Sequence, residues 1–408
     1  MNYVNTNIRR DLYTKQLKEY ANLPLIKVIT GIRRSGKSAL LELLREDILK
    51  VTDLEHIISI NFEDLEFDFI SDYKKLHEYV LSQIKDDRMH YVLLDEIQNI
   101  DQWEKAVNSL RLKNTDIYIT GSNSNILSSE LSTFLAGRYV EFRLYTLSFA
   151  EFIDFRKTYG IGSEDIDDEL DAYIRIGGFP VLSKGRFGDG TAGKVIADIN
   201  NSAILRDVVQ RNKIRNVQLL QKLIAFIYDN IGNITTVKSI ADHFKKERRT
   251  ADYETIHNYL KYLEDALIIN KIQRYDIRGR RLLDTYDKYY LTEHSLQYSV
   301  REYNAKNING ILENIVCLEL MRRGFSVSVG ELGDKEIDFI AEKHGRKLYI
   351  QVCYLFAGKD TIEREFSPLK KISDNYPKIV VTMDEYWNVE EEGIRGMHLR
   401  DFLLSDFW

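Results

Sequence analysis

The sequence has few cysteines and few prolines, and it has no long hydrophobic run. Its 408 residues include only two cysteines, Cys317 and Cys353, each inside an apolar segment. Two such cysteines argue against a disulfide framework or a zinc site and favour a reducing compartment. No apolar run approaches the ~20 residues that a membrane span requires, and the N-terminal segment MNYVNTNIRRDLY lacks the apolar core of a signal peptide. We therefore expect a cytoplasmic protein without a membrane segment.

The chain also lacks a strong excess of charge of one sign. It carries 57 lysines and arginines against 63 aspartates and glutamates, a net charge of −6. This balance excludes a basic nucleic-acid coat protein, so any contact with nucleic acid must come from local patches. The four prolines are too few to mark linkers by composition. The length exceeds one ordinary hydrophobic core, so two or three domains are expected.

One short segment, GIRRSGKS at residues 31–38, has the spacing of a phosphate-binding loop. Gly31 and Gly36 allow a tight turn whose backbone N–H groups point at phosphate oxygens. Lys37 would reach the outer phosphates, and the Ser38 hydroxyl would hold Mg²⁺. The apolar run LIKVIT precedes the loop and helically spaced leucines follow it, so strand, loop and helix appear in the required order. The sequence therefore predicts a nucleoside triphosphate site rather than an ordinary glycine turn, formed by Gly31, Ile32, Arg33, Arg34, Ser35, Gly36, Lys37 and Ser38.

A second segment supplies the acids that such a site needs. About sixty residues after the loop, YVLLDEIQ reads as a buried strand that ends in Asp95 and Glu96. Adjacent carboxylates at the tip of a strand suit hydrated magnesium and the activation of water. We expect Asp95 to support the metal, together with Ser38, and Glu96 to orient or deprotonate the attacking water.

A third strand, in DIYITGSNSN, resembles the strand of AAA-type ATPases whose polar tip senses the γ-phosphate or the water. By that resemblance Asn123 is the sensor candidate, although it could equally cap a helix formed by SNILSSELSTFL. Arg138 follows in LAGRYVEFRL, where an arginine could contact the charge of the transition state, in cis or from a neighbouring copy of the chain. The alternative is a surface arginine in a Gly-Arg turn.

Taken together, TGIRRSGKS, YVLLDEIQ, ITGSNS, LAGRYVEFRLYTLSFAEF and RIGGFP resemble the predicted bacterial and archaeal AAA-type ATPases whose ATPase domain is fused to a winged helix and a restriction-endonuclease-like domain. The resemblance covers nearly the whole chain. It implies binding and hydrolysis of ATP with Mg²⁺, and it leaves the biological task open. The expected fold class is α/β: a P-loop NTPase parallel sheet with a helical lid, then a winged helix and an α/β nuclease-like domain.

The corresponding domains are residues 1–145 for the ATPase core, 146–215 for the lid, 216–295 for the winged helix and 296–408 for the nuclease-like part. Within the lid, RFGDGTAGK at residues 186–194 reads as a glycine-rich loop between helices, and Gly177 and Gly178 as a turn that ends a helix. Three helical patterns followed by two strands, LIINKIQRYD and DKYYLTE, form the winged-helix pattern.

The expected wing of this winged helix is rich in arginine. A patch that could contact DNA phosphates consists of Arg274, Arg278, Arg280 and Arg281. The third helix is acidic, however, so packing of this segment against a protein partner is supported about as well as contact with DNA. DNA and a protein thus remain alternative partners, and a role of Arg138 in trans would require a homo-oligomer.

The C-terminal segment resembles the PD-(D/E)xK nuclease fold in the order of its helix and hairpin. Active members carry an Asp and a Glu-x-Lys on paired strands, which hold magnesium and stabilise charge. Here Asp338 stands on the first strand, but QVC replaces Glu-x-Lys with Gln351 and Cys353. Glu313 could still help Asp338 to bind metal, with Lys335 or Lys347 as a substitute lysine. The simpler expectation is lost nuclease chemistry, so the hypotheses are an ATP-driven switch on DNA, a nucleotide-gated regulatory protein, and last an ATP-dependent nuclease.

Overall fold

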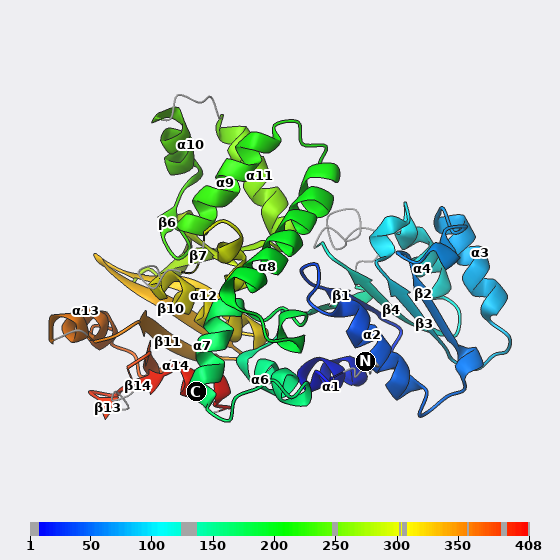
Figure 1. Cartoon of the computed structure of the whole chain (residues 1–408), viewed down its shortest axis with the longest axis horizontal. Helices are drawn as coiled ribbons and strands as arrows, with labels where there is room; N and C mark the ends of the chain where they lie inside the picture. The colour runs from blue at the N-terminus through cyan, green and yellow to red at the C-terminus, as the bar shows by residue number, and fades with distance from the viewer. Residues whose placement is uncertain are drawn as a thin grey trace. The chain divides into compact units, whose positions relative to one another are not determined.

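The computed structural model describes residues 8–123, 137–246, 252–301, 303, 308–356, 359–384 and 390–406. The chain divides into two compact units (Figure 1). The first unit comprises residues 1–146 together with 265–267, and the second comprises residues 147–264 and 268–408. Within the described residues, no helix is long and apolar enough to cross a membrane.

A five-stranded parallel sheet forms the centre of the first unit. Its strands are β1 (Ile26–Thr30), β2 (Ile57–Asn61), β3 (His90–Asp95), β4 (Thr115–Gly121) and β5 (Tyr139–Arg143), in the order β2-β3-β4-β1-β5. The helices are α1 (Asp11–Glu19), α2 (Lys37–Ile48), α3 (Tyr73–Gln83) and α4 (Trp103–Leu110). This arrangement confirms the predicted α/β class with a parallel sheet.

The sheet is buried on both faces because its strands carry apolar residues at successive positions. Val28 packs in one core with residues of α3 and α4, whereas its neighbour Ile29 packs in the other with residues of α1 and α2 (Figure 1). Leu94 and Leu93 divide in the same way on β3. Successive side chains of a strand point to opposite faces, so continuous apolar runs such as KVIT and YVLL place a helix layer on each side.

The second unit begins with helices: α6 (Phe149–Thr158), α7 (Ile166–Ile176), α8 (Asp189–Ala203), a π-helical continuation at Ile204–Gln210, α9 (Val217–Asp229), α10 (Val237–Lys246) and α11 (Tyr253–Asp265). The last three match the predicted helical patterns, and Thr236 caps α10 by accepting the N–H of Ser239 at 2.9 Å. The prediction of a glycine-rich loop over residues 186–194 is wrong from Asp189 onward, because α8 begins at that residue. Its glycines meet open space, so the helix tolerates them without a packing partner.

The Gly177–Gly178 turn ends α7, as predicted. Gly177 has φ +76°, and a β-carbon there would clash with Ser295 and the carboxylate of Glu293. The N–H of Gly178 donates to Glu293 Oε1 at 3.2 Å, and its carbonyl accepts the N–H of Leu147 at 2.7 Å. Glycine is therefore required both for the left-handed φ and for the close approach of the backbone to a buried carboxylate.

A nine-stranded mixed sheet completes the second unit, in the order β13-β14-β12-β11-β10-β9-β7-β8-β6. The strands are β6 (Ile234–Thr235), β7 (Ile269–Asp276), β8 (Arg281–Leu291), β9 (Ser326–Leu332), β10 (Lys335–Lys343), β11 (Arg346–Cys353), β12 (Lys378–Thr382), β13 (Glu390–Glu391) and β14 (Ile394–His398). Helices α12 (Ile308–Arg322), α13 (Lys359–Lys370) and α14 (Leu399–Leu404) accompany it. The hairpin strand β7 pairs in parallel with β9, which joins residues 216–295 and 296–408 in one sheet.

The hairpin of β7 and β8 is longer than expected. The sequence places a connection over IRGRRLLDTY, but β8 begins at Arg281, which pairs with Asp276. The register shifts between Ile272 and Arg274, so the pairing continues past an irregularity that the sequence does not announce. The division of this unit into lid, winged helix and nuclease-like part stays a prediction.

Candidate functional site

The loop between β1 and α2 is shaped by two residues with positive φ. Gly36 precedes α2 with φ 101°, and Arg34 has φ 65°. A β-carbon on Gly31 would clash with the backbone carbonyl of Leu144 and with the Ser35 hydroxyl. The loop therefore needs its first glycine for close packing and its second for backbone conformation. Its other members are the buried Ile32, Arg33, which is ion-paired with Glu63, and the exposed Arg34.

The side chain of Lys37 lies buried under this loop. Its ammonium donates to the carbonyl oxygens of Gly31 at 3.1 Å and Ile32 at 3.4 Å. The same Nζ lies 3.6 Å from Oε1 of Glu96, at the end of β3. The structure thus brings together the lysine and the carboxylate that the sequence assigns to one site.

Asp95 and Ser38 also meet. The Asp95 carboxylate is hydrogen-bonded to the hydroxyls of Ser38 and Thr120. Burial raises the pKa of Asp95, and these two hydrogen bonds only partly offset that effect. A buried carboxylate beside a hydroxyl is a donor set that suits Mg²⁺, which prefers oxygen ligands. The Ser35 hydroxyl is buried and has no hydrogen-bond partner within the described residues, as expected where a polar ligand would bind.

Glu96 is held by its backbone as well as its side chain. It has φ 55°, a left-handed conformation that is costly for a residue with a side chain. Its N–H donates to Thr120 Oγ1 at 2.9 Å, and the amide of Gln98 donates to its carboxylate. Thr120, on β4, therefore supports both acids. Thr120 was not predicted from the sequence, although it stands directly before the Gly121-Ser122-Asn123 segment.

Asn123 follows β4, and β4 lies between β1 and β3 in the sheet. Because all three strands run in parallel, their carboxyl ends meet at one edge, and the buried Asn123 stands between the loop and the acids. This position agrees with the sensor interpretation. The alternative, a cap on a helix in residues 124–136, falls outside the described residues.

The structure does not bring Arg138 to this edge. Arg138 precedes β5, and the first residue of β5, Tyr139, pairs with Ile26 at the start of β1. The arginine therefore stands at the amino edge of the sheet, a strand's length from the loop, and its guanidinium donates to Asn108 Oδ1 at 3.1 Å. This placement does not favour action in cis, and a role in trans stays a prediction.

Arg10 is a second residue that sequence reasoning missed. Its buried guanidinium donates to the carbonyl oxygens of Ser35 at 3.2 Å, Tyr145 at 2.9 Å and Thr146 at 3.1 Å. It also lies over the ring of Tyr13, 4.7 Å from the centroid. Arg10 therefore connects the loop at residues 31–38 to the segment that follows β5. In the sequence Arg10 is only an arginine just before an amphipathic helix, and such a position does not indicate a functional residue.

The arginines of the β7–β8 hairpin have different surroundings. Arg274 is ion-paired with Glu331 of β9 at 2.9 Å and lies over the ring of Tyr286. Arg278, Arg280 and Arg281 are exposed at the turn. The predicted four-residue patch is therefore a three-residue patch, because β9 packs beside β7 and engages Arg274.

Two of these arginines line a pocket of about 580 Å³. Its walls combine cationic and aromatic side chains with a few others: Tyr275, Ile277, Arg278, Arg280, Leu332, Lys347, Tyr349, Lys371, Ile372, Ser373, Asp374 and Tyr376. The ammonium of Lys347 lies 5.2 Å from the ring centroid of Tyr275. Cations interleaved with aromatic rings are typical of sites that bind single-stranded nucleic acid.

Lys347, one of the two expected substitute lysines, does not stand beside Asp338. Lys347 pairs with Glu342 at 2.7 Å, whereas Lys288 of β8 lies buried among three carboxylates. Its Nζ is 2.7 Å from Glu336, 3.6 Å from Glu313 and 4.0 Å from Asp338. Burial would lower the pKa of Lys288, but the carboxylates outweigh it and the pKa is raised. Lys288 lies on a strand from another segment, so spacing in the sequence could not identify it.

Gln351 and Cys353, which stand where the expected nuclease motif would have Glu and Lys, lie in a buried network of hydrogen bonds. Gln351 accepts the N–H of Asp338 and donates to Glu365 at 3.0 Å. Asp338 accepts the N–H of Val352 at 2.8 Å. Burial raises the pKa of the Cys353 thiol to about 12, so the sulfur is neutral at physiological pH. The loss of nuclease chemistry stays a prediction.

Comparison with known proteins identifies two regions of the chain. The family described as "AAA domain" matches residues 24–153. A second family, "Domain of unknown function (DUF8612)", matches residues 167–307. A Haemophilus influenzae protein described as "Uncharacterized protein" is 38% identical over 98% of this chain and 99% of its own length. An uncharacterized protein of Methanocaldococcus jannaschii is 31% identical over 85% of this chain and 78% of its own.

Several solved structures match much of the chain at low similarity. The Walker-type ATPase of Pyrococcus abyssi matches with a TM-score of 0.49 and 16% identity over 72% of this chain and 95% of its own. The Aeropyrum pernix ORC1 protein, solved in complex with DNA, matches with a TM-score of 0.32 and 12% identity over 75% and 92%. AMPPCP-bound DnaA of Aquifex aeolicus matches with a TM-score of 0.30 and 14% identity over 62% and 86%.

Proposed function

Because the chain belongs to the same family as the Haemophilus influenzae and Methanocaldococcus jannaschii proteins and its first unit has an AAA-type ATPase fold, we propose that it binds and hydrolyses ATP with Mg²⁺. One observation carries the proposal: Lys37, Ser38 and the Asp95–Glu96 pair converge at the carboxyl edge of the parallel sheet. That edge is where ligands bind in open α/β sheets.

Each residue has a definite task in this proposal. The backbone N–H groups of the loop and the N-terminus of α2 hold the phosphates. Lys37 exchanges its contacts with the carbonyls of Gly31 and Ile32 for phosphate oxygens. Ser38 and Asp95 hold Mg²⁺, which when bound neutralises charge on the outer phosphates.

Glu96 orients the attacking water and accepts its proton, and Asn123 contacts the γ-phosphate or the water. Without nucleotide, Lys37 lies 3.6 Å from Glu96 and competes for its carboxylate. A triphosphate draws the ammonium away, because it carries more charge than one carboxylate, and Glu96 is then free to act as a base. The proposal thus makes activation of the base depend on the ligand.

We propose further that the nucleotide state controls the second unit on DNA. Residues 216–295 act as a winged helix, and residues 296–408 as a nuclease-like part without nuclease chemistry. Arg278, Arg280 and Arg281 would contact phosphates, and the adjoining pocket offers tyrosine rings to an unpaired base. Arg274 belongs to the sheet rather than to this surface, since it is paired with Glu331.

The test is steady-state ATP hydrolysis by the whole chain, with and without single- and double-stranded DNA. We expect hydrolysis that disappears in Lys37→Ala and rises with DNA. The double variant R278A/R280A should lose the DNA stimulation and flatten the salt dependence of DNA binding, with the basal rate unchanged. Arg281→Ala should reduce DNA binding less, and hydrolysis that stays absent with an intact Lys37 would contradict the proposal.

A second candidate is a nucleotide-gated regulatory protein that binds a protein partner through the same unit. The acidic helix α11 favours it, because Glu254 is exposed on the helix that would otherwise face DNA phosphates. Lys37-dependent hydrolysis that is unaffected by both kinds of DNA would select this candidate.

We place either activity in the cytoplasm. A contribution of Arg138 from a neighbouring copy would make the active form a homo-oligomer. That form is tested by mixing Arg138→Ala with Lys37→Ala chains.

A further inference from the structure

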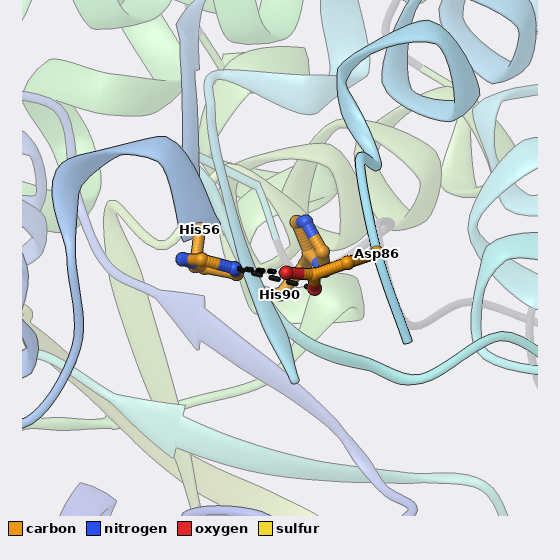
Figure 2. Close-up of side chains that lie close together, drawn as sticks. All are labelled: His56, Asp86 and His90. Atoms are coloured by element: carbon orange, nitrogen blue, oxygen red, sulfur yellow. Dashed lines mark hydrogen bonds and ion pairs between the residues drawn. The ribbon is translucent and has the colours of Figure 1, made fainter. Parts of the chain in front are cut away.

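Three side chains gather at the opposite edge of the parallel sheet from the proposed ATP site. His56 ends the short 3-10 helix Leu54–His56 before β2, His90 begins β3, and Asp86 lies in the connection before β3 (Figure 2). One ring nitrogen of each histidine and one oxygen of Asp86 all lie within 4.8 Å of one another. We propose that His56, Asp86 and His90 bind a divalent transition-metal ion, with Zn²⁺ as the best-suited ion.

The spacing suits such an ion. His56 Nε2 lies 3.2 and 3.3 Å from the two oxygens of Asp86. Ligand atoms placed at about 2.0–2.1 Å from a tetrahedral zinc are separated by roughly 3.3 Å. The first two ligands already have this separation, and the His90 nitrogen lies within 4.8 Å of both. The fourth position remains for water, so the site would have two histidines and one carboxylate.

The partner contacts of the three residues orient the ligand atoms. His90 Nδ1 donates to the carbonyl of Arg88 at 2.9 Å, so its lone pair is on Nε2, where it accepts the backbone N–H of Lys85 in a long hydrogen bond of 3.4 Å. A metal ion would replace this one hydrogen bond. A hydrogen bond like the one from Nδ1 fixes metal-ligating histidines in many proteins. Asp86 is likewise oriented, by the backbone N–H of Arg88 at 2.9 Å and its Nε at 2.8 Å.

His56 can present a lone pair once a cation is bound. Without a metal, its Nε2 donates to the Asp86 carboxylate. Its Nδ1 is buried and has no hydrogen-bond partner within the described part of the chain. When a cation takes the place of the Nε2 proton, the ring can carry its proton on Nδ1 and turn the Nε2 lone pair toward the ion. Both histidine rings are almost fully buried, with exposures of 1% and 0%, and their centroids lie 4.8 Å apart.

The charge around the cluster also attracts a cation. Arg88 is ion-paired with Asp86 at 2.8 Å, Asp53 at 3.5 Å and Glu55 at 3.6 Å. One guanidinium thus faces three carboxylates, and the excess negative charge lies next to the two imidazole rings. The scarcity of cysteine, which argues against a zinc site of the cysteine type, does not bear on this donor set.

The position of the site defines its role. β3 begins at His90 and ends at Asp95, so the two sites occupy opposite ends of one strand. An ion bound by His56 and His90 would not compete with the Mg²⁺ proposed at Asp95. It would instead tie the amino ends of β2 and β3 to the segment that contains Asp86, which is a structural role.

The test is binding of Zn²⁺ and Co²⁺ to the EDTA-treated whole chain. We expect one high-affinity equivalent per chain and visible Co²⁺ absorption bands typical of low coordination. His56→Gln, His90→Gln and Asp86→Asn should each weaken Zn²⁺ binding by at least about tenfold. His77→Gln is the matched control, since His77 contacts Ser109 Oγ at 2.9 Å and stands outside the cluster.

Two further measurements keep the outcomes distinct. Each variant should keep the circular dichroism and ATP binding of the parent, and the exposed Asp86→Asn change reports on the site even where a buried histidine variant unfolds. Zn²⁺ should raise the melting temperature of the parent and of Lys37→Ala equally, which separates this site from the ATP site. The absence of saturable Zn²⁺ binding, or equal affinity in Asp86→Asn and the parent, would overturn the inference.

Discussion

The guanidinium of Arg10 donates to the carbonyl oxygen of Ser35 at 3.2 Å, inside the loop that the sequence assigns to phosphate. Arg10→Ala should therefore weaken ATP binding roughly tenfold, because the loop loses a charge-assisted hydrogen bond that fixes its shape. Titration of a fluorescent ATP analogue measures the effect. Arg10→Lys should restore little, since an ammonium does not span the separate carbonyls of Ser35, Tyr145 and Thr146.

The neighbouring Arg9 supplies the control for this prediction. Arg9 is about half exposed and forms ion pairs with Asp11 and Asp47. Arg9→Ala should leave ATP affinity unchanged, because exposed ion pairs contribute little. If both variants lost affinity equally, the effect of Arg10 would be general destabilisation rather than positioning of the loop.

Glu96→Gln should separate binding from hydrolysis. The amide keeps the size and much of the hydrogen bonding of Glu96 but cannot accept a proton from water. We expect ATP affinity close to that of the parent, or tighter, because the carboxylate no longer competes for Lys37. The hydrolysis rate should fall by about 10²-fold or more. A Glu96→Gln chain with the parental rate would show that another group activates the water.

The two glycine environments in the second unit predict opposite effects on stability. Gly177→Ala should lower the free energy of unfolding by about 2–4 kcal/mol, because the methyl group meets Glu293 and Ser295 at positive φ. Gly190→Ala should raise it by about 0.5–1 kcal/mol, because the new methyl group meets open space in the first turn of α8. Urea unfolding of both variants beside the parent measures the difference.

Removal of the buried ammonium should make stability strongly dependent on pH. Lys288→Met should cost about 3–5 kcal/mol at pH 8, because Glu336, Glu313 and Asp338 lose their counter-charge. Burial already raises the pKa values of Glu313 and Asp338, and loss of Lys288 raises them further. A carboxyl with a raised native pKa keeps its proton to a higher pH in the native state, so between the unfolded and native pKa values the native chain binds more protons than the unfolded one.

The loss of stability should therefore grow as pH rises through the pKa values of these native carboxyls and shrink toward pH 5. Urea unfolding of Lys288→Met at pH 5 and pH 8 measures it. Lys271→Met is the control, since Lys271 is partly exposed and forms a single ion pair with Asp287 at 3.0 Å. A pH-independent loss in Lys288→Met would mean that the three carboxyls are not coupled to this lysine.

The features that the sequence predicted well were local. The loop at 31–38 and the acids at the tip of β3 follow from spacing within one segment, so pattern alone identifies them. The three helical patterns of residues 216–265 are likewise present as α9, α10 and α11.

The features that were missed join segments distant in sequence. Arg10 contacts a carbonyl at position 145, and Lys288 contacts a carboxylate at position 336. The place of Arg138 in the sequence suggested a contact with the phosphates, but β5 runs parallel to β1, so Arg138 lies at the amino edge of the sheet, away from the loop. The glycines of 188–193 suggested a loop, yet helix α8 forms over most of them because intrinsic propensity is weaker than tertiary packing.

The pairing of β7 with β9 decides how the protein can be divided for experiments. A fragment that ends at residue 295 would leave one side of β7 without its partner strand, and the complementary fragment would leave the facing side of β9 equally uncovered. Unpaired strand edges recruit other chains, so both halves should precipitate or form dimers. Fragments cut at residue 295 would then give misleading results in functional assays. A useful fragment must keep β7 and β9 together.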